Sequence, residues 1–211
     1  MKEEMFPLIP EQQCQVLQET YTHVQNVYDI ILDEDICEPS YYRDAFHVLR
    51  TAQEQDLVRL IINSDGGHMS SGVAFRNAIS EANCPVIAVI EGACHSSAAM
   101  IALSCDDIEV KPFASNLNHN VSYGSAGTGS DIKAHVEFTA RQTEKFLREV
   151  YKHYLSKQEI EEILQGRQLW LDDEQMRERW ALVQEMRKLE WEEEHPEEPS
   201  EETLDTTSLN N

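Results

Sequence analysis

Apolar and polar residues alternate in blocks through the centre of the chain, and the blocks predict strands followed by helices. Short apolar runs typical of buried strands occupy residues 27–32, 57–62, 85–90 and 107–110. Between them, apolar residues recur at helical spacing over residues 40–52, 71–81 and 96–103. Strands this apolar are not expected to have a solvent-exposed face. Together with the order of elements, this predicts an α/β fold with a parallel sheet covered by helices.

The longest helical signal runs from Ser130 to about Ser156, without proline or glycine. A helix of this length exceeds what one small core needs. We therefore expect it to protrude from the domain and to pack against another subunit. Its apolar positions are Ile132, Val136, Phe138, Phe146, Leu147, Val150 and Tyr154.

The two ends of the chain differ in composition from the centre. Residues 1–26 contain one apolar patch and no core pattern, which predicts an N-terminal segment outside the core. Residues 27–184 form the expected domain. Residues 185–211 are rich in Glu, interrupted by proline and poor in apolar residues, so we expect an acidic disordered tail that is dispensable for the fold.

Charge and cysteine content narrow the class of function. The chain has 17 Lys and Arg against 39 Asp and Glu, and its net charge of −22 opposes binding to nucleic acid or to anionic membranes. No apolar run reaches the roughly 18 residues that would span a bilayer, and the first residues lack the pattern of a signal peptide. Five cysteines without paired spacing indicate reduced thiols. We expect a cytoplasmic protein that binds no nucleic acid, membrane, metal or cofactor.

Two glycine-containing turns follow predicted strands, at the sheet edge where open α/β folds place their sites. Gly66-Gly67 leaves backbone N–H groups free to meet a ligand, although a double glycine is also an ordinary tight turn. Ser96 lies between a strand and a helix among small residues, where a helix N-terminus stabilises negative charge. Such a serine is often only a helix cap, and so neither turn identifies a function by itself.

A nucleophilic serine needs a base, and the sequence offers two candidates. His119 follows a short predicted strand and precedes the Gly-rich residues 122–129, which favours it. His95 is adjacent to Ser96, but neighbouring residues at a helix start rarely present their side chains to one another. The remaining histidines lie on helices, beside the double glycine or in the flanking segments.

Five stretches occur in a recognisable order: LIINSDGGHMSSGVAFRNAI, PVIAVIEGACHSSAAMIAL, KPFASNLNHNVS, TGSDIKAHVEFTARQTEKFLREVYKHY and GRQLWLDDEQ. Together they resemble the Clp protease proteolytic subunit family over about residues 27–183. The resemblance implies the Clp/crotonase fold, which has repeated β-β-α units and a protruding long handle helix. By position it implies Ser96 as nucleophile, His119 as general base, and the N–H groups of Gly67 and Ser97 as the oxyanion hole.

The chain departs from the family pattern at the third catalytic position. Gln168 stands where the family has an aspartate, and a neutral amide orients an imidazole without stabilising an imidazolium. Asp172 and Asp173 lie close enough in sequence to be considered as substitutes. Asp65 stands where a proline is usual, which places a negative charge beside the double glycine.

The resemblance implies a serine endopeptidase that cleaves unfolded polypeptides inside an oligomeric ring chamber. The homo-oligomer would be a heptameric ring or double ring, with a Clp-type AAA+ unfoldase or a paralogue of the family as partner. Residues 1–26 would then be axial or partner-contacting. Gln168 keeps an alternative open, namely a weakly active or non-catalytic ring subunit that acts as scaffold or regulator. A crotonase-fold enzyme acting on an acyl-coenzyme A shares the oxyanion hole, but the sequence shows no basic pocket for the coenzyme phosphates.

Overall fold

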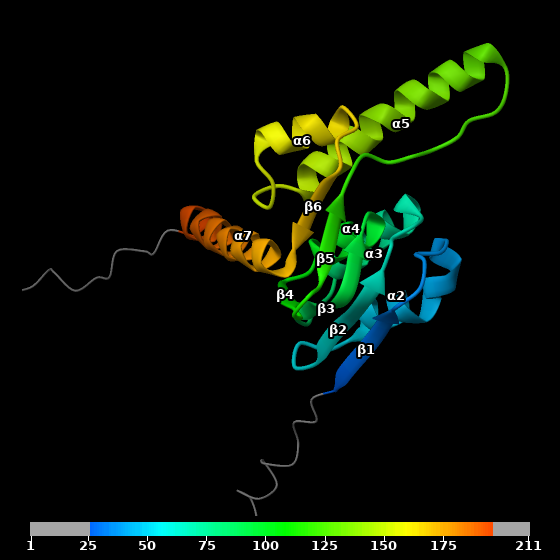
Figure 1. The fold of residues 1–211 in the computed structure, drawn as a ribbon. Helices are drawn as coiled ribbons and strands as arrows, with labels where there is room; N and C mark the ends of the chain where they lie inside the picture. The colour runs from blue at the N-terminus through cyan, green and yellow to red at the C-terminus, as the bar shows by residue number, and fades with distance from the viewer. Residues whose placement is uncertain (1–25, 196–211) are drawn as a thin grey trace, which may run out of the picture.

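A single mixed sheet forms the centre of the computed structural model, which describes residues 26–195 (Figure 1). The strand order is β1-β2-β3-β5-β6, and β4 also pairs with β3. All neighbouring strands are parallel except β5 and β6, which are antiparallel. The predicted α/β fold is therefore confirmed, with one antiparallel edge strand that the sequence did not predict. The strands are β1 (Val27–Leu32), β2 (Leu57–Ser64), β3 (Val86–His95), β4 (Asp107–Val110), β5 (Ser115–Asn118) and β6 (Leu169–Asp172).

The helices pack against one face of the sheet. More buried positions alternate with more exposed ones along β1, β2 and β5, so the expectation that no strand face meets solvent is wrong. The predicted helix over 40–52 is split, because a 3-10 turn (η1) precedes a regular helix (α2). Tyr42, Phe46 and Phe75 form a cluster of edge-to-face rings that packs this pair onto the next helix. The elements are η1 (Pro39–Tyr42), α2 (Arg43–Thr51), α3 (Met69–Ser80), α4 (Ser97–Ala102), α5 (Gly129–Val150), α6 (Lys157–Leu164) and α7 (Asp173–Glu194).

Helix α5 projects away from the sheet, and most of its side chains are exposed (Figure 1). Thr128 begins it with a capping box to Asp131. The helix ends at Val150 rather than near Ser156, since His153 adopts a φ of +65° in the following turn. Neither proline nor glycine signals this break, so the sequence pattern overestimated its length. Among residues 26–195, no helix is both long enough and apolar enough to cross a membrane.

Helix α7 corrects the expectation of a disordered segment from residue 185 onward, because it continues to Glu194. Polar contacts rather than apolar burial anchor this part. The Arg187 guanidinium donates to the carbonyls of Leu103 (3.3 Å) and Cys105 (3.0 Å), and it lies 4.9 Å from the Trp180 ring centroid. Glu190 accepts from His153 at 3.0 Å. The rest of the expected tail, residues 196–211, lies outside the described residues, as do residues 1–25.

Candidate active site

Ser96 occupies a strained turn between β3 and α4. Its φ of +55° and ψ of −123° are unfavourable for a residue with a side chain, at a cost of about 1–3 kcal/mol. The Ser96 N–H donates to the Leu117 carbonyl at 2.8 Å, which ties the turn to β5. A sharp strand-to-helix turn of this kind is the geometry that presents a nucleophilic serine at the top of a sheet. The side chain is half-buried, so Ser96 is accessible at the sheet edge.

The double glycine lies directly against this turn. A Cβ on Gly66 would stand 2.5 Å from the His95 carbonyl oxygen and 2.7 Å from the Ser96 Cβ. Both glycines have positive φ values, +94° at Gly66 and +153° at Gly67. Only glycine tolerates both the positive φ and the close packing against residues 95 and 96, so the double glycine allows the two turns to lie in contact.

Two N–H groups next to Ser96 remain free to bind a ligand. The Ile36 N–H donates to the Gly66 carbonyl and the His68 N–H to the Ile36 carbonyl, both at 2.8 Å. Because backbone groups alternate along an extended segment, the Gly67 N–H points to the opposite side. The Ser97 N–H belongs to the first turn of α4, where no intrahelical acceptor exists. Within the described part of the chain neither group donates a hydrogen bond, as an oxyanion hole requires.

The strand ladder brings His119 and Gln168 to neighbouring places. The antiparallel pairing of β5 and β6 ends with Asn118 opposite Leu169, so His119 and Gln168 are the next residues on the two strands. His119 is half-buried and Gln168 is exposed. Among residues 26–195 no side-chain hydrogen bond joins His119 to Ser96 or to Gln168. Catalytic hydrogen bonds often tighten only when substrate binds, so the missing bond does not count against His119, and its role as base stays a prediction.

The two aspartates considered as substitutes for the missing acid are engaged elsewhere. Asp172 accepts from the Gln175 N–H at 2.9 Å and caps α7. Asp173 pairs with Arg177, whose hydrogen bond lowers the pKa of the carboxyl. Asp172 also lies opposite Ser115, three ladder positions from the end near His119. Neither is placed to orient His119.

His95, the alternative base, is not available to take a proton from Ser96. Its Nδ1 lies 2.8 Å from an Asp65 carboxylate oxygen and its Nε2 lies 3.0 Å from the Ser115 hydroxyl. Both ring nitrogens are thus occupied. Cys94 is equally unsuited to nucleophilic chemistry, since complete burial raises the pKa of its thiol to about 12.

An open groove of about 490 Å³ runs along the outer side of the double glycine. Three of its lining side chains are carboxylates, those of Asp35, Glu38 and Asp65, and the aromatic ring of Tyr41 adjoins them. An anionic wall of this kind favours a cationic ligand.

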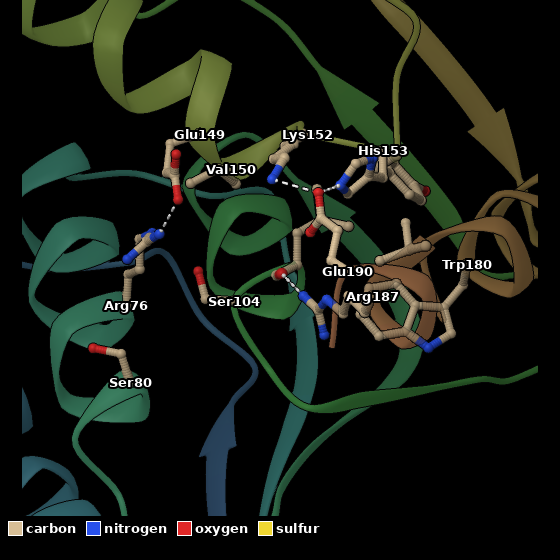
Figure 2. Close-up of a pocket in the computed structure, with 13 residues that line it drawn as sticks. Arg76, Ser80, Ser104, Glu149, Val150, Lys152, His153, Trp180, Arg187 and Glu190 are labelled. Atoms are coloured by element: carbon tan, nitrogen blue, oxygen red, sulfur yellow. Dashed lines mark hydrogen bonds and ion pairs between the residues drawn. The ribbon is translucent and has the colours of Figure 1, made fainter. Parts of the chain in front are cut away.

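A second cavity, of about 250 Å³, lies away from Ser96 and between α3, α5 and α7 (Figure 2). Its charged groups are paired with one another: Arg76 with Glu149 at 2.9 Å, and Lys152 with Glu190 at 2.8 Å. Arg187 is held by backbone carbonyls. Because its charges are neutralised in this way, the cavity is a weaker candidate for a reactive site than the turn at Ser96. Among the described residues, no group of His, Cys, Asp and Glu is arranged to hold a metal ion.

Comparison with known proteins identifies the family and the fold. A family model described as Clp protease matches residues 12–186. Among solved structures, the chain is similar to a mutant of ClpP1 from Listeria monocytogenes, with a TM-score of 0.57 and 17% sequence identity, over 81% of this chain and 94% of that chain. No curated protein sequence gives a significant match. The structural likeness confirms the Clp/crotonase-type fold, while the role of α5 as a handle stays a prediction.

Proposed function

The chain belongs to the Clp protease family, and from that premise we propose that it is a serine endopeptidase subunit that cleaves unfolded polypeptides by Ser-His catalysis. The observation that carries the proposal is the strained turn at Ser96, with its φ of +55°, beside the free N–H groups of Gly67 and Ser97. A turn of this cost is retained where it places a reactive side chain.

Each residue of the site has a defined role in the proposed reaction. Ser96 attacks the peptide carbonyl carbon while the imidazole of His119 takes the hydroxyl proton. The Gly67 and Ser97 N–H groups stabilise the oxyanion as the tetrahedral intermediate forms. His119 then gives its proton to the leaving amine, and a water molecule hydrolyses the acyl-enzyme by the reverse sequence.

Gln168 limits the rate of this reaction. No carboxylate of the described residues contacts His119, so the imidazolium that forms after proton transfer lacks a negatively charged partner. This observation favours a second candidate function, in which the chain is a weakly active or non-catalytic subunit that serves as scaffold or regulator.

The proposed assembly is a homo-oligomeric ring or double ring, with seven subunits per ring, in contact with a Clp-type AAA+ unfoldase or a paralogue of the family. Support comes from α5, which projects from the sheet and exposes 54% of Phe138 and 39% of Val136. A large part of each of these apolar side chains is exposed in one subunit, and burial between subunits would remove it from water. We further propose a cytoplasmic location, which is supported by the four described cysteines being free.

Degradation of casein by the purified full chain tests the proposal, with the particle size followed by light scattering. We expect a particle many times 24.2 kDa and casein cleavage that Ser96→Ala abolishes. Phe138→Glu should reduce the particle size. An assembled particle without activity would favour the scaffold, and a strict monomer with activity unaffected by Ser96→Ala would refute the proposal.

A further inference from the structure

Three side chains outside the proposed site form a continuous hydrogen-bonded chain. Asp65 lies 2.8 Å from the Nδ1 of His95, and the Nε2 of His95 lies 3.0 Å from the Ser115 hydroxyl. A carboxylate only accepts hydrogen bonds, so Nδ1 carries the proton and Nε2 of the neutral ring is the acceptor. The Ser115 hydroxyl therefore donates to His95, which is the order of partners in a serine–histidine–aspartate triad.

The strand register brings these residues together from three distant parts of the sequence. His95 is the last residue of β3, Ser115 is the first of β5, and Asp65 follows the end of β2. In the ladder, Ala93 pairs with Ser115 and His95 with Leu117, so these side chains share one face of the sheet.

That face is partly open to solvent, although only 12% of the His95 side chain is exposed, whereas the opposite face is packed. Cys94 and Asn116, which alternate with His95 and Ser115 along their strands, are buried. On the open face Ser115 is half-buried, and the ring of Trp170 lies 5.1 Å from that of His95 with 54% of its surface exposed. The aromatic leaving group of a small aryl ester would therefore lie beside an aromatic surface at Ser115.

We propose that Ser115, His95 and Asp65 form a second nucleophilic site, with Ser115 as nucleophile, His95 as base and Asp65 as the group that orients the ring. This proposal goes beyond the peptidase function and does not depend on Ser96. The contrast with the first site supports it, because His95 has the carboxylate that His119 lacks. Among residues 26–195, no two unpaired N–H groups adjoin Ser115 as those of Gly67 and Ser97 adjoin Ser96. The substrate class is therefore activated esters, whose leaving groups depart with little stabilisation, rather than amides.

The proposed reaction is an ordinary acyl transfer to the serine. The bond from the Ser115 Oγ to the acyl carbon forms, its proton passes to the Nε2 of His95, and the bond from that carbon to the phenolate oxygen breaks. The phenolate takes the proton from His95. Water then attacks the acyl-serine, gives a proton to His95 and releases the carboxylic acid, and the proton returns to the Ser115 Oγ.

Site-resolved labelling in a Ser96→Ala background tests the proposal independently of the first site. The full chain is treated with a fluorophosphonate, whose phosphorus bonds to the serine oxygen as fluoride leaves, and the modified peptide is identified by mass spectrometry. We expect modification of Ser115, and hydrolysis of p-nitrophenyl acetate that Ser115→Ala abolishes. Asp65→Asn should slow labelling at least about tenfold, less than the ~10⁴ of a buried triad aspartate, because 79% of the Asp65 side chain is exposed.

Ser125 provides a matched control, since its hydroxyl lies 3.0 Å from the Nδ1 of His135. Among residues 26–195 no carboxylate pairs with that histidine, so Ser125 should stay unmodified and Ser125→Ala should change nothing. The proposal is overturned if Ser115 stays unmodified in the folded Ser96→Ala protein, or if Asp65→Asn and His95→Gln leave its labelling rate unchanged. Either result overturns only the proposal for Ser115 and does not affect the proposal for Ser96. Conversely, an unreactive Ser96 would not affect the proposal for Ser115.

Discussion

Replacing Gln168 with aspartate restores the charge that the proposed peptidase site lacks. The ladder places residue 168 next to His119 across β5 and β6, so the new carboxylate would stand where it can accept from the imidazole. Aspartate is one methylene shorter than glutamine, and therefore Gln168→Glu is tested beside it to preserve the length. Both variants should raise the reactivity of Ser96, because a carboxylate stabilises the imidazolium that forms as His119 takes the proton.

The size of the gain follows from the exposure of the position. Two unit charges about 4 Å apart interact by about 1 kcal/mol in water and by about 4 kcal/mol in the partly shielded surroundings of a protein surface. Since about 1.4 kcal/mol corresponds to a factor of ten in rate, these limits give a gain of about 5-fold to about 10³-fold. Gln168 is exposed, which favours the lower part of that range, about tenfold.

The assay is the second-order rate of fluorophosphonate labelling at Ser96, together with kcat/KM for a fluorogenic peptide. Gln165→Asp is the matched control, because Gln165 is an exposed glutamine three residues earlier, at the C-cap of α6, and the substitution adds the same charge. The reasoning is refuted if both Gln168 variants label at the wild-type rate, or if Gln165→Asp gives an equal gain.

Three further predictions concern the stability of the fold. Arg187→Met should cost about 2 kcal/mol of unfolding free energy, or about 4–8 °C in Tm, because it removes charged hydrogen bonds to the carbonyls at the end of α4. The control, Lys188→Met on the exposed side of the same helix, should cost less than about 0.5 kcal/mol in the same calorimetric scan. Ser97→Ala should leave Tm unchanged or raise it, because the Ser97 hydroxyl is buried without a hydrogen-bond partner while the N–H is kept; a loss of several degrees would contradict this. The hydrogen bond from Arg179 lowers the pKa of Glu159 to about 2, so the carboxylate stabilises the fold above its usual pKa near 4.5, and this contribution is lost as the pH falls toward 2. Denaturant unfolding should show that Glu159→Gln is less stable than the wild type at pH 7 and equally stable near pH 2. The same stability difference at both pH values would contradict this prediction.

The strands that carry the site could be predicted because their apolar runs are unambiguous. Residues 57–62 and 85–90 formed β2 and β3 as expected, and each of these strands ends near a residue of the site. The position of Ser96 between a strand and a helix was also predicted. Its φ of +55° was not, since no local sequence rule assigns a positive φ to serine.

Tertiary contacts decided the features that the sequence did not predict. Residues 185–194 read as a solvated acidic segment, yet Arg187 and Glu190 dock this stretch through polar contacts that a hydrophobicity pattern does not register. The chain of Asp65, His95 and Ser115 depends on the register of three strands. The sequence did not predict a role for Ser115, because a single serine at the start of a short strand has no distinguishing pattern.

Site-resolved fluorophosphonate labelling of the wild-type full chain tests the central claim most directly. The account predicts that Ser96 is modified, and that His119→Ala slows its modification by about 10² or more, the usual contribution of a general base. A folded protein in which Ser96 stays unmodified, or in which its labelling rate does not respond to His119→Ala, would contradict the account.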